Sequence, residues 1–325
     1  MGGIDFIIEK ARRSRPKKKI VLPEVNDERV IEAAQEIKRQ GIAELLFVGE
    51  AGNISELNTL GKVIAPAADS DAERIAEAFY ESRKHKGMAP DEAKSIICKN
   101  PLYYAAMMVR LGMADGFVAG ASNTTRDVIR AAMHSIGIDR STGIVFGVFV
   151  IEVDRTVYGS EGLFIFADCA VIPLPTPKQL ARIAISSSDL LNRLYGIEPK
   201  VAFLTYSSKG SAEGESIDRA RKAVALVKEK RPGLAVDGEL QLDAAIIPDI
   251  QRRKAPDSPL AGRANVLIFP SLDAGNITYK AVEKLGGARA VGPTIMGLKK
   301  PCSDLSRGCR TEDIIATIAL TVVRS

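Results

Sequence analysis

The sequence predicts an α/β protein with two domains, each built on a mostly parallel sheet flanked by helices. Strand-like and helix-like patterns alternate along the chain, which is typical of parallel α/β sheets. The 325 residues exceed what one hydrophobic core usually serves, so about two domains with a cleft between them are expected. Hydrophobic residues make up 46% and charged residues 26%, a composition that excludes a disordered chain.

The first part of the chain predicts successive pairs of strands and helices. Residues 19–24 (KIVLPE) form a β-rich run. The helix that follows has an apolar stripe from Val30 to Ile37 and is expected to end at Gly41. Later segments repeat the pattern, with strands predicted at 43–49 and 62–66, helices at 55–61, 69–83 and 90–111, and a strand entering a turn at 114–125.

The pattern changes after residue 138. Two long apolar strands at 141–153 and 162–171 predict an antiparallel hairpin, and the change indicates a domain boundary near residue 140. Strand and helix pairs then return, and a closing helix is expected from Thr311. These later pairs are 200–210 with 217–230, 234–239 with 243–253, and 264–271 with 276–285.

Several classes of protein are disfavoured by the composition. The longest strongly apolar run, residues 314–323, is about half of the ~20 residues that cross a bilayer and indicates a buried helix. No segment resembles an export signal, so a cytoplasmic protein is expected. Two histidines and no C-x-x-C pair exclude a multi-histidine or paired-cysteine metal site. Six basic residues among positions 12–19 lack interleaved aromatics, which favours a solvated surface over a nucleic-acid site.

Three loops that follow predicted strands are rich in small and polar residues. Ligands of α/β sheets bind at the carboxyl ends of strands, and the free N–H groups of a following helix favour phosphate. Each loop could instead be an ordinary helix cap, and neither a G-x-G-x-x-G motif nor a P-loop is present. The candidate binding residues in these loops are Ser122, Asn123, Ser207, Lys209 and Asn276.

The segment LSRGC (305–309) lies just before the expected closing helix. Arg307 can place a planar, charged fork on a phosphate or on a carbonyl oxygen that gains charge. Ser306 can donate a hydrogen bond, and Asp313 in the first helical turn can accept a proton. The structural alternative is that Asp313 only complements the helix dipole and pairs with Arg307.

Seven stretches in order resemble the phosphate acetyltransferase family: LPEVNDERV, ESRKHKG, YGSEGLFIFADCAV, YSSKGSA, DGELQLDAAI, IFPSLDAGNITYK and DLSRGC. The resemblance implies reversible transfer of an acetyl group between coenzyme A and inorganic phosphate, giving acetyl phosphate, without a metal or a tightly bound cofactor. It also implies a homodimer acting in acetate metabolism. The implied fold is of the isocitrate/isopropylmalate dehydrogenase type, with residues 1–140 plus 299–325 in one domain and 141–298 in the other.

Residue roles follow from the same resemblance. Asp313 matches the base for the coenzyme A thiol, Ser306 the residue that orients the thiol, and Arg307 the one that steadies the acyl phosphate. Arg83 and Arg130 match coenzyme A-binding arginines, and Arg29 matches a further substrate-binding arginine.

Other functions are weighed against this expectation. A butyryl or other short acyl group is the nearest alternative, although LSRGC favours acetyl. A metal- and NAD-dependent hydroxyacid dehydrogenase would share the implied fold but needs clustered aspartates. A covalent acyl-cysteine at Cys309 or Cys169 lacks an evident histidine partner. A non-catalytic binding module predicts no turnover.

Overall fold

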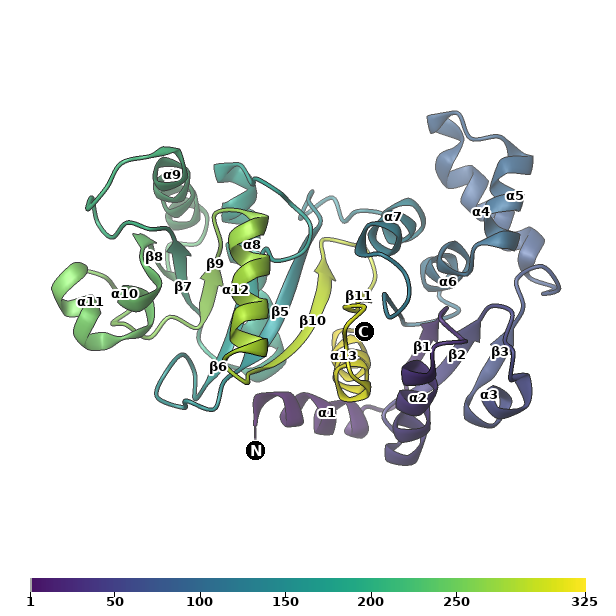
Figure 1. The fold of residues 1–325 in the computed structure, drawn as a ribbon. Helices are drawn as coiled ribbons and strands as arrows, with labels where there is room; N and C mark the ends of the chain where they lie inside the picture. The colour runs from purple at the N-terminus through teal and green to yellow at the C-terminus, as the bar shows by residue number, and fades with distance from the viewer. Residues whose placement is uncertain (1) are drawn as a thin grey trace. The chain divides into compact units, whose positions relative to one another are not determined.

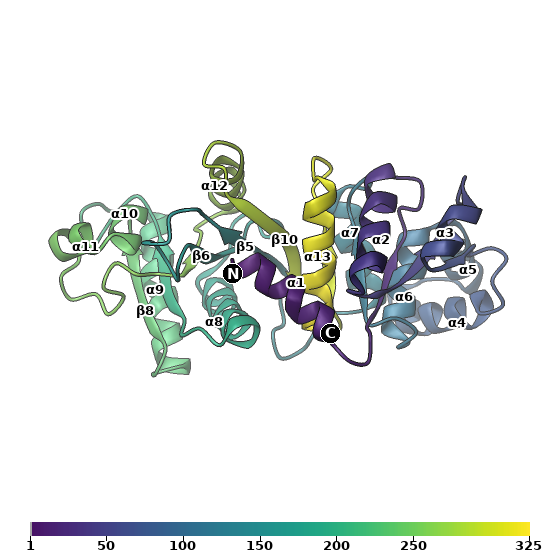
Figure 2. The same ribbon diagram turned by 90° about the horizontal axis from the view of Figure 1, so that it is seen from below.

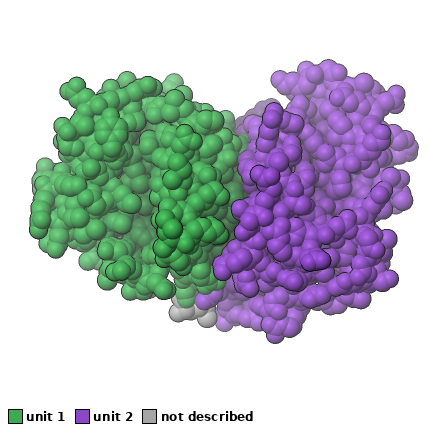
Figure 3. Space-filling view, viewed as in Figure 1, with its two compact units in different colours: residues 1–4, 141–296 green, residues 5–140, 297–325 purple. Residues whose placement is uncertain are grey.

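The computed structural model describes residues 2–325, and Figures 1 and 2 draw its elements from two sides. The chain forms two compact units (Figure 3). Unit 1 consists of the described part of residues 1–4 with residues 141–296, and unit 2 of residues 5–140 with residues 297–325. Whether these units fold independently, as the predicted domain boundaries imply, stays a prediction.

Unit 2 contains a five-stranded sheet in which every neighbouring pair is parallel, in the order β3-β2-β1-β4-β11. Parallel strands need crossover helices, which is why strands and helices alternate here. The strands are β1 (Lys19–Leu22), β2 (Glu44–Val48), β3 (Lys62–Ile64), β4 (Gly116–Ala119) and β11 (Cys302–Asp304).

Helices cover both faces of this sheet. One face carries α13 packed beside α2, which Figure 2 shows, and the other carries α6 with α7 and α4. Helix α2 has Asp27 as its N-cap and Gly41 in the left-handed region at its end, as predicted. The bounds are α1 (Gly3–Arg13), α2 (Glu28–Gln40), α3 (Ile54–Leu60), α4 (Ala72–Arg83), η1 (Lys84–Lys86), α5 (Pro90–Lys99), α6 (Pro101–Arg110), α7 (Thr125–Ser135) and α13 (Thr311–Arg324).

Unit 1 contains a six-stranded sheet in the order β10-β5-β6-β9-β7-β8. Strand β5 is antiparallel to both neighbours, which confirms the predicted hairpin of β5 with β6, and the remaining pairs are parallel. The strands are β5 (Phe146–Glu152), β6 (Leu163–Ala167), β7 (Lys200–Leu204), β8 (Ala235–Leu240), β9 (Val266–Ile268) and β10 (Arg289–Met296).

The helices of unit 1 also lie on the sheet. Helices α8 and α9 pack together against its parallel strands, and α12 packs against β6 and β10 (Figure 1). Aromatic rings fill the core between these layers, with Phe149 stacked on Tyr279 at 4.0 Å between centroids. The bounds are α8 (Pro177–Tyr195), α9 (Glu215–Lys230), α10 (Leu242–Ile246), α11 (Pro248–Lys254) and α12 (Leu272–Lys284).

The structure confirms the predicted α/β class and corrects some elements. The helix predicted at 243–253 is two short helices, because Pro248 cannot continue α10 and begins α11 instead. Helix α13 begins at Thr311 as predicted, and its apolar run is buried. No helix within residues 2–325 has both the length and the apolar character that a membrane span requires.

Candidate active site

The carboxylate of Glu24, just after β1, organises the loop that follows β4. Both of its oxygens accept backbone N–H groups at 2.8–2.9 Å, from Gly120 and Ala121 on one oxygen and from Ser122 and Asn123 on the other. The side-chain amide of Asn123 adds a bond of 2.7 Å. The backbone N–H groups of residues 120–123 are therefore occupied by a carboxylate of the protein, and the predicted binding of phosphate at the start of the following helix stays a prediction.

Gly120 lets the ends of β4 and β11 approach closely. Its φ of +118° is unfavourable for a residue with a Cβ atom. An added Cβ would lie 2.4 Å from Asp304 Oδ1 and 2.6 Å from the backbone nitrogen of Leu305. Only glycine fits this position, and the close approach brings the loop after β4 beside the segment that begins with Leu305.

A pocket of about 360 Å³ opens at the carboxyl ends of β1 and β2. The side chain of Ser122 is exposed there, and that of Asn123 is partly exposed. The carboxyl edge of the sheet thus offers the polar side chains of Ser122 and Asn123 to a ligand, although the backbone N–H groups of residues 120–123 are bound to Glu24. The lining residues are Pro23, Glu24, Val25, Asn26, Asp27, Gly49, Glu50, Pro101, Ser122 and Asn123.

Arg29, in the first turn of α2, uses all of its guanidinium donors within unit 2. Nε donates to Asp27 Oδ1 at 3.0 Å, and Nη2 donates to Asp27 Oδ2 at 2.7 Å and to the carbonyl of Ala121 at 2.8 Å. Nη1 donates to the carbonyls of Arg307 at 2.8 Å and Cys309 at 3.0 Å. The hydrogen bond from Arg29 lowers the pKa of Asp27, so the pair stays ionised.

The predicted contact of Arg29 with substrate stays a prediction, and these bonds show a second role for the side chain within the protein. A guanidinium has five N–H donors, and the contacts with Asp27 and three carbonyls account for them. Every donor of Arg29 thus has an acceptor within the protein in this structure. Arg29 fixes the backbone of residues 307–309 against the loop after β4, which makes it a positioning residue.

The segment Ser306–Asp313 presents its polar groups at the start of α13. The N–H of Gly308 donates to Ser306 Oγ at 3.3 Å, and the side chain of Arg307 is exposed. Asp313 accepts the backbone N–H of Arg310 at 2.9 Å and pairs with its guanidinium at 3.3 Å. The suggested pairing of Asp313 with Arg307 is therefore wrong, and Arg307 is left pointing to solvent.

Arg83, at the end of α4, and Arg130, on α7, lie near the same two side chains. Both guanidinium charges contribute to lowering the pKa of His134 and oppose the rise that burial causes in the pKa of Tyr103. The side chain of Arg130 is 45% exposed, and its nearest acid, Asp127, is 4.0 Å away. Two positive charges from different helices thus converge on one region of unit 2.

Comparison with known proteins identifies the family of this chain. The model of the "Phosphate acetyl/butaryl transferase" family matches residues 4–322. The chain belongs to that family. A phosphate acetyltransferase of Acetivibrio thermocellus is 46% identical over 330 residues, covering 100% of this chain and 98% of the relative.

Solved structures agree with the sequence comparison. A phosphotransacetylase from Streptococcus pyogenes superimposes with a TM-score of 0.88 at 36% identity, covering 99% of this chain and 97% of that one. A putative 4-hydroxythreonine-4-phosphate dehydrogenase from Salmonella typhimurium shares the fold alone, with a TM-score of 0.56 at 12% identity and coverage of 96% and 100%. The predicted dehydrogenase-like fold is thus confirmed.

In unit 1, the side chains of the loop after β7 form hydrogen bonds and an ion pair within the protein. Ser207 is fully buried, and its Oγ accepts the N–H of Ala212 at 3.1 Å and lies 3.2 Å from Ser211 Oγ. Lys209 forms an ion pair with Asp237, whose side chain is only 3% exposed. The predicted substrate contacts of Ser207 and Lys209 stay predictions; in this structure Ser207 binds within its own loop, and Lys209 ties the loop to β8.

Asn276 does not lie at a helix start, as the sequence predicted. Helix α12 begins four residues earlier, and Ser271 caps it by accepting the N–H of Ala274 at 3.3 Å. Asn276 Nδ2 donates to the carbonyl of Cys169 at 3.2 Å. The neighbouring Asp168 is 2% exposed and accepts four backbone N–H groups, so Asn276 supports a tightly bonded turn after β6.

The cysteines do not suit a covalent mechanism. Burial raises the pKa of the Cys309 thiol to about 11, although the adjacent Arg29 acts in the opposite direction. Cys169 is fully buried, and its thiol pKa is raised well above the usual value. Because the thiolate is the nucleophile, neither residue is prepared to form an acyl-cysteine.

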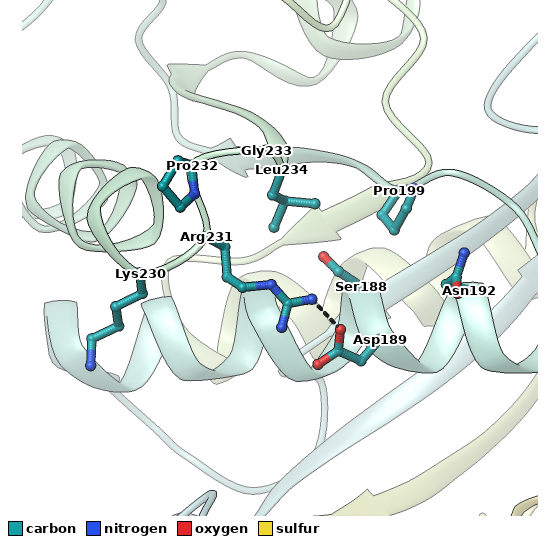
Figure 4. A pocket seen from close by; sticks show the side chains of 9 residues that line it. All are labelled: Ser188, Asp189, Asn192, Pro199, Lys230, Arg231, Pro232, Gly233 and Leu234. Atoms are coloured by element: carbon teal, nitrogen blue, oxygen red, sulfur yellow. Dashed lines mark hydrogen bonds and ion pairs between the residues drawn. The ribbon is translucent and has the colours of Figure 1, made fainter.

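A second pocket, of about 390 Å³, lies in unit 1 away from the carboxyl ends of the strands. Figure 4 shows Arg231 paired with Asp189 across it, at 2.5 Å. Pro199 and Leu234, which precede β7 and β8, line it, so it lies at the opposite edge of the sheet from the predicted ligand edge. We assign it no part in the site.

Sequence reasoning missed Glu24 and Asp304 as residues that build the site. Each is an acidic residue at the end of a buried strand, which is a readable signal. Asp304 is 1% exposed, and its Oδ2 accepts Thr125 Oγ1 at 2.6 Å. Its Oδ1 has no hydrogen-bond partner among residues 2–325.

The burial of Asp304 predicts a pH-dependent stability. Burial, with a smaller contribution from Glu24, raises the pKa of Asp304 to about 7. Between about pH 4 and pH 7 the folded state holds a proton that the unfolded chain has lost, so the free energy of unfolding falls as pH rises through this window. Asp304→Asn keeps an acceptor for Thr125 and should stabilise by about 4 kcal/mol at pH 8 but by only about 1.5 kcal/mol at pH 5.

Thermal unfolding at pH 5 and pH 8 measures this difference. The exposed Asp91 of α5 offers the matched control, Asp91→Asn, whose effect should be small at both pH values. An Asp304→Asn effect that is equal at both pH values would refute the buried titration.

Proposed function

We propose that the protein is a phosphate acetyltransferase, which moves an acetyl group between coenzyme A and inorganic phosphate. The observation that carries the proposal is 46% identity over the full chain to an enzyme of that name. The exposed Arg307, whose backbone carbonyl is held by Arg29, and Asp313 in the first turn of α13 offer the groups that this chemistry needs.

In the proposed mechanism the thiol of coenzyme A attacks the acyl carbon of acetyl phosphate directly. The sulfur–carbon bond forms as the Asp313 carboxylate takes the thiol proton, and the carbon–oxygen bond to phosphate breaks. The phosphate leaves with the electron pair, and its developing charge is stabilised by Arg307. Ser306 orients the thiol through its hydroxyl. The reverse direction uses the same groups in the opposite order.

The free-energy cost of this proton transfer is smaller than the activation barrier of a typical enzyme. A free thiol has a pKa of about 8.5 and an ordinary aspartate about 3.9, so complete transfer costs roughly 6 kcal/mol. Turnover of about 1–1,000 per second corresponds to a barrier of roughly 13–17 kcal/mol. Transfer that accompanies attack by sulfur costs less, so no covalent enzyme intermediate is required.

The remaining assignments extend this proposal. Arg83 and Arg130 bind coenzyme A through phosphate, and the side chains of Ser122 and Asn123 contact substrate from the pocket after β4. We propose a homodimer with no tightly bound cofactor. We also propose a role in acetate metabolism and a cytoplasmic location; the four cysteines, which are all free thiols, fit a reducing compartment.

A thioester assay tests the function. Purified protein mixed with acetyl phosphate and coenzyme A should form acetyl-coenzyme A, followed by thioester absorbance. Rates with acetyl-, propionyl- and butyryl-coenzyme A then test the acyl group, and a clear butyryl preference would overturn the choice of acetyl. A metal-dependent dehydrogenase is disfavoured, because residues 2–325 contain no cluster of three or more acidic, histidine or cysteine side chains suited to a metal ion.

Replacing Arg83 with alanine should raise the KM for coenzyme A by about 10- to 100-fold, since a charged hydrogen bond contributes about 1.5–3 kcal/mol. The KM for acetyl phosphate should change little. Arg74 on the same helix is exposed and paired with Asp71, so Arg74→Ala is the matched control. An unaltered KM for coenzyme A in a folded Arg83→Ala variant would remove Arg83 from the ligand site.

A further inference from the structure

A tyrosine and a histidine lie within the electrostatic reach of both proposed coenzyme A arginines. Tyr103 on α6 places its hydroxyl 3.2 Å from Nδ1 of His134 on α7. Phe79 of α4 packs edge-on against Tyr103 with 5.5 Å between ring centroids, which fixes the tyrosine ring. Arg83 ends the same α4, and Arg130 stands one turn before His134.

The arginines keep donors available to a ligand. The Nε atom of Arg83 is buried and has no hydrogen-bond partner among residues 2–325. A buried donor without a partner is costly, so it indicates a group that arrives with the ligand. Arg130 is 45% exposed, and its 4.0 Å approach to Asp127 leaves its charge largely unpaired. The cluster therefore has both positive charge and access to solvent.

We propose that Tyr103 and His134 complete a phosphate site with Arg83 and Arg130, and that binding of a coenzyme A phosphate there is coupled to proton uptake by His134. This inference rests on the proposed function, because that function supplies coenzyme A as the ligand.

Electrostatics gives the direction of the coupling. Burial and the charges of Arg83 and Arg130 lower the pKa of His134, which favours the neutral imidazole in the empty site. A bound phosphate offsets those positive charges and favours the imidazolium. The charged groups that face the pair are Arg83 from α4 and Arg130 with Asp127 from α7, while α6 contributes the tyrosine itself.

Protonation also redirects a hydrogen bond. When His134 is neutral and Nδ1 carries no proton, Tyr103 donates its O–H to that nitrogen. When Nδ1 is protonated it donates to the tyrosine oxygen instead, and the O–H of Tyr103 is released to donate to the phosphate. One proton moves from solvent to His134, and no covalent bond of the ligand changes.

Calorimetry of coenzyme A binding measures the proton directly. Titrations at pH 6.5 in two buffers of different ionisation enthalpy should show uptake of about 0.3–0.5 proton more by the unaltered protein than by His134→Gln. The chain has one other histidine, the exposed His85 of η1, so His85→Gln is the matched control and should keep the full uptake. Equal uptake in the unaltered protein and His134→Gln, or uptake lost in His85→Gln instead, overturns the proposal.

Kinetics tests the tyrosine independently. Tyr103→Phe should raise the KM for coenzyme A about five-fold and leave kcat and the KM for acetyl phosphate within about two-fold, as loss of one net hydrogen bond implies. Retained proton uptake with 3′-dephospho-coenzyme A would assign the site to the diphosphate, and lost uptake would assign it to the 3′-phosphate. If Arg83→Ala weakens coenzyme A binding while Tyr103→Phe and His134→Gln change nothing, this inference fails and the proposed function stands. If the unaltered protein transfers no acetyl group, the proposed function itself fails.

Discussion

Replacing Asp313 with asparagine should lower the turnover of acetyl transfer by about 10²- to 10⁴-fold, the usual contribution of a general base. The KM values for coenzyme A and acetyl phosphate should change little, because the base acts on a proton that moves only in the transition state. Asparagine keeps an oxygen that can accept the N–H of Arg310, so the cap of α13 should survive. Steady-state rates with both substrates varied measure the effect.

The adjacent Glu312 supplies the control for this experiment. It is exposed in the same helical turn, so Glu312→Gln removes a carboxylate of similar position without removing the proposed base. Turnover by Asp313→Asn that matches the Glu312→Gln variant, in proteins with equal Tm, would contradict the assignment of Asp313.

Replacing Arg29 with alanine should lower kcat by about 10²- to 10³-fold and change the KM for coenzyme A much less. The side chain fixes the carbonyls of Arg307 and Cys309. Loss of two or more charge-assisted bonds should raise the activation free energy by about 3–4 kcal/mol, because the segment is no longer held in position. Arg29→Lys should recover little, since an ammonium cannot reproduce the planar arrangement of five donors. Steady-state kinetics and thermal unfolding of both variants provide the measurement.

The division between kcat and KM separates positioning from binding. If Arg29 contacted coenzyme A, its loss would raise the KM and spare turnover at saturation. That result would refute the positioning role. Arg39→Ala on the same α2 helix is the control, because the side chain of Arg39 is 74% exposed and pairs with Glu36 of the same helix.

Elements whose signals are local could be predicted from the sequence. Helix α2 was predictable because Gly41 ends an apolar stripe, and the β5–β6 hairpin because two apolar runs flank a polar turn. Strand β10 was not predicted, because Pro293 lies where its register shifts and interrupts the alternation of a regular strand. Helix α8 carries a capping box from Thr176 to Gln179, a readable start that the sequence predictions omitted.

The site was less predictable than the fold, since its bonds join distant parts of the chain. Glu24 binds N–H groups 96 to 99 residues away, and Arg29 binds carbonyls 278 to 280 residues away. Local patterns carry no information about such pairs. The resemblance to a known family proposed roles for Asp313 and Arg307, but it could not show that Arg29 donates its hydrogen bonds to other parts of the protein.

The order of the chain in unit 2 has a consequence for biosynthesis. Strand β11 and helix α13 come from residues 297–325, whereas residues 141–296 of unit 1 form one continuous stretch. A ribosome synthesises the amino end first. When residue 296 has emerged, all strands of unit 1 are present, but β4 of unit 2 still lacks its neighbour β11. The carbonyls of Arg307 and Cys309, two of the acceptors of Arg29, emerge last, so under the proposed mechanism a chain still under translation lacks its complete site.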